Sequence, residues 1–93
     1  MVKPHLEIKP EDCSPIGLLI LQHMEFHQLS FTQMADNLGI SRAALRIACL
    51  KNGNPGARMV PKLAAVLELK ELEVKALISE NKLNQIYKNN ADS

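Results

Sequence analysis

Aromatic residues are nearly absent from this sequence: its 93 residues include two Phe, one Tyr and no Trp, although hydrophobic residues make up 46%. A core with so few aromatic rings has to be aliphatic, which suits a helical bundle. Long hydrophobic runs are missing as well. The longest aliphatic run covers only residues 18–21, whereas a transmembrane helix needs roughly 20 residues. The sequence therefore predicts one small helical domain and no membrane-spanning segment.

Cysteine is scarce too, and no signal peptide is evident. The only two cysteines, Cys13 and Cys49, lie far apart and form no C-x-x-C motif, which favours reduced thiols over a disulfide framework. The N-terminal residues are charged and interrupted by Pro4 and Pro10, unlike the apolar stretch of a secretory signal. These features predict a cytoplasmic protein.

Acidic residues are missing from the central part of the chain. Residues 37–67 contain no Asp or Glu but five basic residues, whereas residues 1–36 carry a net charge of −3 and residues 68–93 a net charge of −1. Such a basic segment is expected of a surface that binds phosphate groups. Five basic residues are also an ordinary surface density for this length, but that alternative gives no reason for the missing acids.

The segment around residues 29–50 carries the capping residues of two short helices. Ser30 and Gln33 form a Ser-x-x-Gln capping box, and apolar residues then recur at helical spacing. Gly39 suits a left-handed helix end, and Ser41 is a second N-cap. The sequence predicts two helices joined by a short turn, over residues 31–38 and 42–50.

A characteristic order of apolar, small and capping residues runs through the same segment: Leu29, Ser30, Met34, Ala35, Leu38, Gly39, Ile40, Ser41 and Leu45. In these residues the chain resembles the Xre/Cro/lambda-repressor-like helix-turn-helix family. The resemblance is looser over residues 53–72 and poor at both ends of the chain. It implies an all-α, five-helix, lambda-repressor-like DNA-binding domain with a helix-turn-helix at its second and third helices.

The resemblance also implies a function, the sequence-specific binding of double-stranded DNA by a small, dimeric transcriptional regulator. In this family the third helix, here residues 41–50, lies in the major groove, and its first residues meet base edges. Other basic and polar side chains would contact phosphates, while Leu45 and Ala48 would face the core. The residues expected to contact DNA are Ser30, Thr32, Ser41, Arg42, Ala43, Arg46, Lys51, Asn52, Asn54, Arg58 and Lys62. Such a protein would associate with the nucleoid when bound.

Two features depart from the family pattern. Phe31 stands where the family often has a glutamine that grips a phosphate. The third helix is also unusually apolar, because Ala44, Ile47, Cys49 and Leu50 exceed one buried face. Either this helix is covered on two sides, or its exposed face meets a protein. The alternative function is therefore a helix-turn-helix fold used as a protein-interaction module, an antitoxin or adaptor, whose third helix docks a partner.

The other helices are predicted from caps and periodicity. Ser14 and Pro15 form a clean helix start, and the stripe of the first helix is widened by Phe26. Gly53 comes later than the glycine that ends the third helix in the family, so that helix is extended by half a turn or followed by a remodelled loop. The remaining helices are expected over residues 15–28, 58–67 and 71–88.

The last predicted helix carries a coiled-coil spacing. Apolar or small residues recur every three or four positions, as a and d positions do: Leu69, Leu72, Ala76, Ser79, Leu83 and Ile86. We predict a homodimer whose interface includes Leu72, Ala76, Leu83 and Ile86; the alternative is that both apolar faces cap the core of the monomer. The predicted organisation is an extended N-terminal arm, the helix-turn-helix domain and a polar tail, at residues 1–13, 14–88 and 89–93.

Two histidines in the first predicted helix raise the question of a metal site. His23 and His27 lie one helical turn apart, but the zincin pattern has its glutamate directly after the first histidine. Glu25 is two residues on, so it points away, and no third ligand has a suitable spacing. Nucleophile–base pairs and glycine-rich phosphate loops are also missing. We therefore predict no metal, no cofactor and no enzymatic activity.

Overall fold

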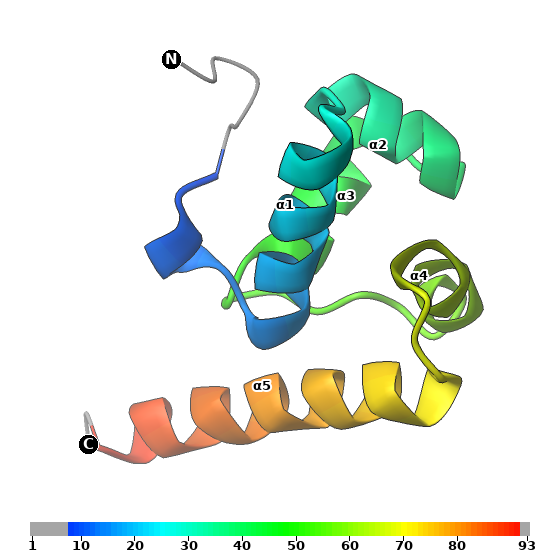
Figure 1. Cartoon of the computed structure of the whole chain (residues 1–93). Helices are drawn as coiled ribbons and strands as arrows, with labels where there is room; N and C mark the ends of the chain where they lie inside the picture. Colours follow the sequence, from blue (N-terminus) through cyan, green and yellow to red (C-terminus); the bar gives the residue numbers. More distant parts are fainter. Residues whose placement is uncertain (1–7, 92–93) are drawn as a thin grey trace.

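The computed structural model describes residues 8–91, which form an all-α arrangement of five helices. Within this part of the chain the only extended pairing is an isolated antiparallel bridge between Cys13 and Leu50. The prediction of a five-helix, all-α chain is confirmed. A single turn of 3-10 helix, η1 (Pro10–Asp12), precedes the helices α1 (Pro15–His27), α2 (Phe31–Leu38), α3 (Arg42–Cys49), α4 (Met59–Leu67) and α5 (Glu71–Ala91) (Figure 1).

Serine side chains begin the first three helices, as the sequence predicts. The Ser14 hydroxyl accepts a hydrogen bond from the Gly17 amide at 3.1 Å. At α2 the capping box is complete, because the Ser30 hydroxyl accepts from the Gln33 amide and the Gln33 side chain accepts from the Ser30 amide. Each cap satisfies amides that have no partner inside the helix, and so fixes where the helix begins.

The turn between α2 and α3 has the geometry that its glycine requires. Gly39 lies in the left-handed region with φ +67°, which a glycine adopts without a steric penalty. Its amide donates to Asp36 O, and the Ile40 amide donates to Ala35 O, both at 3.0 Å. These two bonds are a Schellman motif, which ends α2 and reverses the chain within three residues.

Helix α1 lies at the centre of the bundle and packs against α3, α4 and α5 (Figure 1). Helices α1 and α3 approach closely at Gly17, where a Cβ atom would overlap the backbone carbonyl of Cys49. The core is aliphatic except for Phe31, the only aromatic residue among its buried members. Its largest fully buried side chains include Ile16, Ile20, Met24, Phe31, Met34, Leu38, Leu45, Leu63 and Val74.

Two parts of the fold differ from the sequence predictions. Phe26, expected to widen the packed stripe of α1, is exposed to solvent. Residues 8–13, expected to belong to an extended arm, include the 3-10 turn η1, and Ile8 is buried in the core. Periodicity along one helix cannot reveal which of its apolar faces the rest of the chain covers. The remainder of the predicted arm, residues 1–7, lies outside the described residues, as does the end of the predicted tail.

Candidate nucleic-acid interface

Helix α3 has one buried face and one exposed face. Leu45, Ala48 and Cys49 are fully buried, which confirms the prediction that Leu45 and Ala48 face the core. On the outer side lie Arg42, Ala43, Arg46 and Ile47. Of the apolar residues that exceed one buried face, Cys49 is buried and Ala44 and Leu50 are half-buried. The bundle therefore covers most of the excess, and one large apolar side chain remains outside.

Both ends of α3 are fixed by local contacts. At its start, the Ser41 hydroxyl accepts from the Ala44 amide at 3.1 Å. At its end, the chain turns back so closely that a Cβ at Gly53 would overlap the carbonyl oxygen of Ile47. The helix ends at Cys49, so the extension by half a turn that the late glycine allowed is not present.

Helix α2 begins with its polar groups at the surface. Ser30 is half-buried and Thr32 is exposed, whereas Phe31 is turned inward with only 2% of its surface exposed. A glutamine in the position of Phe31 would be buried in this fold. Any phosphate at this helix end would thus meet Thr32 and the free amides of the first turn rather than the side chain at position 31.

Helix α4 brings one cation, Lys62, toward the turn that precedes α3. The Lys62 ammonium lies 3.8 Å from the position that a Cβ at Gly39 would occupy. Arg58 is the N-cap residue of α4, has helical backbone angles and is exposed. It precedes Lys62 by four residues, so the two side chains lie on one side of the helix. The structure therefore brings Lys62 beside the α2–α3 turn, with Arg58 on the same stripe of α4.

The predicted contact residues after α3 lie elsewhere. The Lys51 ammonium donates to Glu11 O at 3.3 Å, and its amide donates to Asp12 O. Lys51 and the adjacent exposed Asn52 are therefore beside η1, next to acidic residues. In the sequence Lys51 belongs to the same basic segment as the other four cations, but in the structure its side chain contacts η1.

Asn54 belongs to a polar cluster with α5. The amide nitrogen of Asn81 donates to Gly53 O at 3.0 Å and to Asn54 Oδ1 at 2.8 Å. Asn54 in turn donates to Gln85 Oε1, and Gln85 donates to Lys51 O at 2.7 Å. Asn81 is 2% exposed, so this cluster fastens the loop after α3 to α5. Sequence reasoning missed it, although Asn81 and Gln85 continue the inner-face spacing of Val74 and Ile78.

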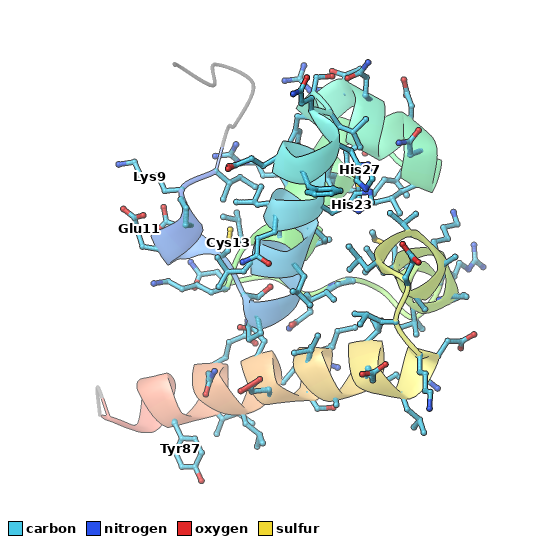
Figure 2. All side chains as sticks on the ribbon, viewed as in Figure 1. Lys9, Glu11, Cys13, His23, His27 and Tyr87 are labelled. Atoms are coloured by element: carbon cyan, nitrogen blue, oxygen red, sulfur yellow. The ribbon has the colours of Figure 1, made fainter. Side chains whose placement is uncertain are left out.

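The histidine pair stands apart from these residues. The rings of His23 and His27 on α1 lie 4.4 Å apart between centroids (Figure 2). Partial burial and the neighbouring His27 lower the pKa of His23, although Glu68 acts in the opposite direction. Within residues 8–91 no three His, Cys, Asp or Glu side chains gather in a way that could hold a metal ion.

Both cysteines are free and buried. Burial raises the pKa of the Cys49 thiol to about 12. Burial also raises the pKa of Cys13, and the adjacent Asp12 and Glu11 add to this. Neither thiol has the lowered pKa of a reactive cysteine.

The residues predicted for a dimer lie together on the outer side of α5. Leu72, Leu83 and Ile86 are 77%, 55% and 54% exposed, and Ala76 is exposed between them. Leu69, the first residue of the predicted a/d series, precedes α5 and is half-buried against the core. The opposite side of α5 buries Val74, Ile78 and Asn81.

None of the helices in the described part of the chain combines the length and the apolar character needed to cross a membrane. Comparison with known proteins identifies no relative: no protein-family model, no curated protein and no solved structure matches this chain.

Proposed function

We propose that this protein binds double-stranded DNA in a sequence-specific manner, as a small transcriptional regulator of the lambda-repressor-like kind. In this proposal α2 and α3 are the helix-turn-helix, and α3 enters the major groove. The observation that carries the proposal is the outer face of α3, which presents Arg42, Ala43 and Arg46 beside a turn that Lys62 approaches from α4.

The dimensions of α3 suit the major groove. An α-helix with its side chains is about 10–12 Å in diameter, close to the ~12 Å width of that groove. Arg42 and Arg46 are one turn apart, so their side chains share an edge of the exposed face. Each can offer a bidentate pair of donors to a guanine, and the methyl group of Ala43 can contact a thymine. These three residues would read the sequence.

Phosphate contacts would come from the surroundings of α3. The first amides of α2, with Ser30 and Thr32, and the first amides of α3, with Ser41, form partially positive helix ends. Arg58 and Lys62 add cations on the α4 side. Residues 37–67 carry no carboxylate to oppose them. Lys51 and Asn54 are left out of this proposed interface because their side chains contact η1 and α5.

A second candidate function follows from Ile47, whose side chain is 56% exposed on the same face. A large aliphatic side chain in the middle of an arginine-bearing surface also suits a protein partner, as in an antitoxin or adaptor. In that case Ala43 and Ile47 would be buried by the partner. The acid-free run of residues 37–67 favours DNA, because a protein-docking face does not require it.

Binding to mixed-sequence duplex DNA at low salt tests the proposal. Fluorescence anisotropy would compare the wild type with Arg42→Ala/Arg46→Ala and with a matched control, Lys9→Ala/Lys70→Ala. The control removes the same charge from exposed residues outside α2, α3 and α4. We expect the arginine variant to bind at least about tenfold more weakly, because two cations near phosphates are lost, and the control to bind less than threefold more weakly.

Selection of preferred sequences from random duplexes then separates residues that contact bases from residues that contact phosphates. Arg42→Ala should relax the preference at one base position, whereas Lys62→Ala should weaken all sequences alike. Undetectable DNA binding by the folded wild type at low salt, or equal losses in the arginine variant and its control, would reject DNA as the ligand of this face. The exposed Ile47 would then make a protein partner the better proposal.

A further inference from the structure

The outer side of α5 is an apolar stripe that this chain leaves uncovered. The other four helices all lie on one side of α5, and Tyr87 extends away from them (Figures 1 and 2). Leu72, Leu83, Ile86 and Tyr87 are more than half exposed. The inner side already has its contacts, since Val74, Ile78 and Asn81 are buried. The stripe is therefore additional to what the monomer needs for its core.

The spacing of the stripe identifies the kind of surface that fits it. Five exposed positions on this side of α5 follow one another at intervals of four, three, four and three residues. The average interval is 3.5, which is the period of a two-stranded coiled coil. The small residues in the middle allow two helices to approach closely. The five positions of this seam are Leu72, Ala76, Ser79, Leu83 and Ile86, all exposed.

The charges beside the seam distinguish its two edges. With Ala76 and Leu83 at a positions, Glu73 and Glu80 occupy e positions, and Lys75 and Lys82 occupy g positions. All four side chains are exposed. One edge is thus acidic and the other basic. Because charged e and g residues remain at the rim of a coiled coil, the apolar contact is limited to a narrow stripe, as in a two-stranded assembly.

We propose that α5 pairs with α5 of a second copy of this chain as a parallel, in-register, two-stranded coiled coil. In that arrangement a g residue faces the e residue five positions later on the other helix. Lys75 of each copy then meets Glu80 of the other. Lys82 of each copy meets Tyr87, whose ring can cover the lysine stem or receive its cation.

An antiparallel arrangement is disfavoured by the same charges. It would bring g positions opposite g positions and e opposite e, so that lysines face lysines and glutamates face glutamates. The cap that Glu73 forms would not remove this repulsion. Its carboxylate accepts a hydrogen bond from the Lys70 amide at 2.9 Å at the start of α5, but it keeps its negative charge. The edge charges therefore specify the orientation as well as the partner. The pairing concerns α5 alone and does not depend on DNA binding.

The seam can be tested by the molar mass of the full chain in sedimentation equilibrium over a range of concentrations. We expect the wild type to reach twice the monomer mass. Leu83→Asp places a charge in the seam but outside the core, and should weaken the dimer more than about a hundredfold. Its circular dichroism should match that of the wild type, because more than half of the Leu83 side chain is exposed in the monomer.

Charge reversal tests the orientation. Lys75→Glu and Glu80→Lys should each weaken the homodimer about tenfold, because two opposite-charge pairs become like-charge pairs. A mixture of the two variants should restore dimers, since the new glutamate of one variant then meets the new lysine of the other. The control Lys70→Glu makes the same charge change before α5 begins and should leave the mass unchanged.

Three results would overturn the proposal. A wild type that stays monomeric at all concentrations would show that the seam does not bind a second copy of the chain. Unchanged mass in folded Leu83→Asp would place any dimer elsewhere. A tighter dimer in Lys75→Glu would indicate the antiparallel arrangement, in which a new glutamate faces a lysine.

Discussion

Helices α3 and α5 each pack one face into the core, but their exposed faces differ in charge and in apolar content. Each buries one face, through Leu45 and Ala48 in α3 and through Val74 and Ile78 in α5. Outside, α3 has two arginines around a small residue and one exposed isoleucine. The outer stripe of α5 is apolar, and it is bordered by acid on one edge and base on the other.

This difference matters because the charged residues beside an exposed face, more than its apolar content, determine what the face can bind. A face whose cations belong to a segment without acidic residues, here residues 37–67, attracts a polyanion. A stripe with one edge of each sign is complementary to a second copy of itself. The inner faces maintain the fold, and the outer faces separate a proposed nucleic-acid surface from a proposed self-association surface.

The largest effect on stability is expected at Gly17, where α1 packs against α3. Gly17→Ala should destabilise the fold by about 3 kcal/mol, because the new Cβ would overlap the Cys49 carbonyl and push α1 away from α3. Helix propensity alone predicts the opposite sign, a stabilisation of about 1 kcal/mol. Urea unfolding measures the difference. Gly56→Ala is the control, since its Cβ would meet nothing within 4 Å; equal stability of the two variants would contradict the packing described for α1 and α3.

The link between α5 and the loop after α3 should have the next largest effect. Asn81→Ala removes the donor to Gly53 O and Asn54 Oδ1 and should cost about 1–3 kcal/mol. Thermal unfolding should show this loss, while Asn84→Ala, at an exposed position on the same helix, should change stability by less than about 0.5 kcal/mol. Matching melting curves for the two variants would mean that the cluster does not hold the loop.

The buried thiol of Cys49 in α3 should make the free energy of unfolding depend on pH. Burial raises the pKa of Cys49 to about 12 from an ordinary value of 9.0, so the folded state disfavours the thiolate. This contribution is complete below pH 9 and is lost as the pH rises toward 12. Between pH 9 and 10 the wild type should lose about 1 kcal/mol more than Cys49→Ala. Parallel stability curves for the two proteins would show that Cys49 ionises equally well in both states.

The smallest effect separates two cations that the sequence groups together. Lys62→Ala should weaken DNA binding about three- to fivefold, because Lys62 adjoins the turn before α3. Lys51→Ala should weaken it less than twofold, because Lys51 lies beside η1 and contacts Glu11 O. Anisotropy at low salt measures both. The reverse order would move the proposed interface to the other end of α3.

Local signals explain why much of the fold could be predicted. The caps at Ser14, Ser30 and Ser41 and the turn at Gly39 act within three or four residues, so the sequence carries them completely. The helices accordingly begin and end within three residues of the predicted positions. The ends of α1 and α4 have no glycine; Gln28 and Glu68 adopt positive φ there, at 55° and 57°, without a distinctive residue type.

Contacts between distant segments could not be predicted in the same way. The burial of Ile8, the exposure of Phe26 and the attachment of Asn54 to α5 depend on which surfaces meet after folding. The proposed interface illustrates both cases. Arg42 and Ala43 lie where the caps predict, on the exposed start of α3, whereas Lys51 is held beside η1 by its bonds to Glu11 O and Asp12 O.

The salt dependence of DNA binding tests the central claim, that the outer face of α3 and the adjoining cations of α4 bind a polyanion. On mixed-sequence DNA, binding is non-specific and electrostatic, so the four cations of the proposed surface, Arg42, Arg46, Arg58 and Lys62, would all act on phosphates, and log K should fall with log salt at a slope of about −3 to −4 per protomer. In Arg42→Ala/Arg46→Ala the slope should become shallower by about 2. A wild-type affinity that does not change with salt, or an identical slope in the double variant, would contradict the account.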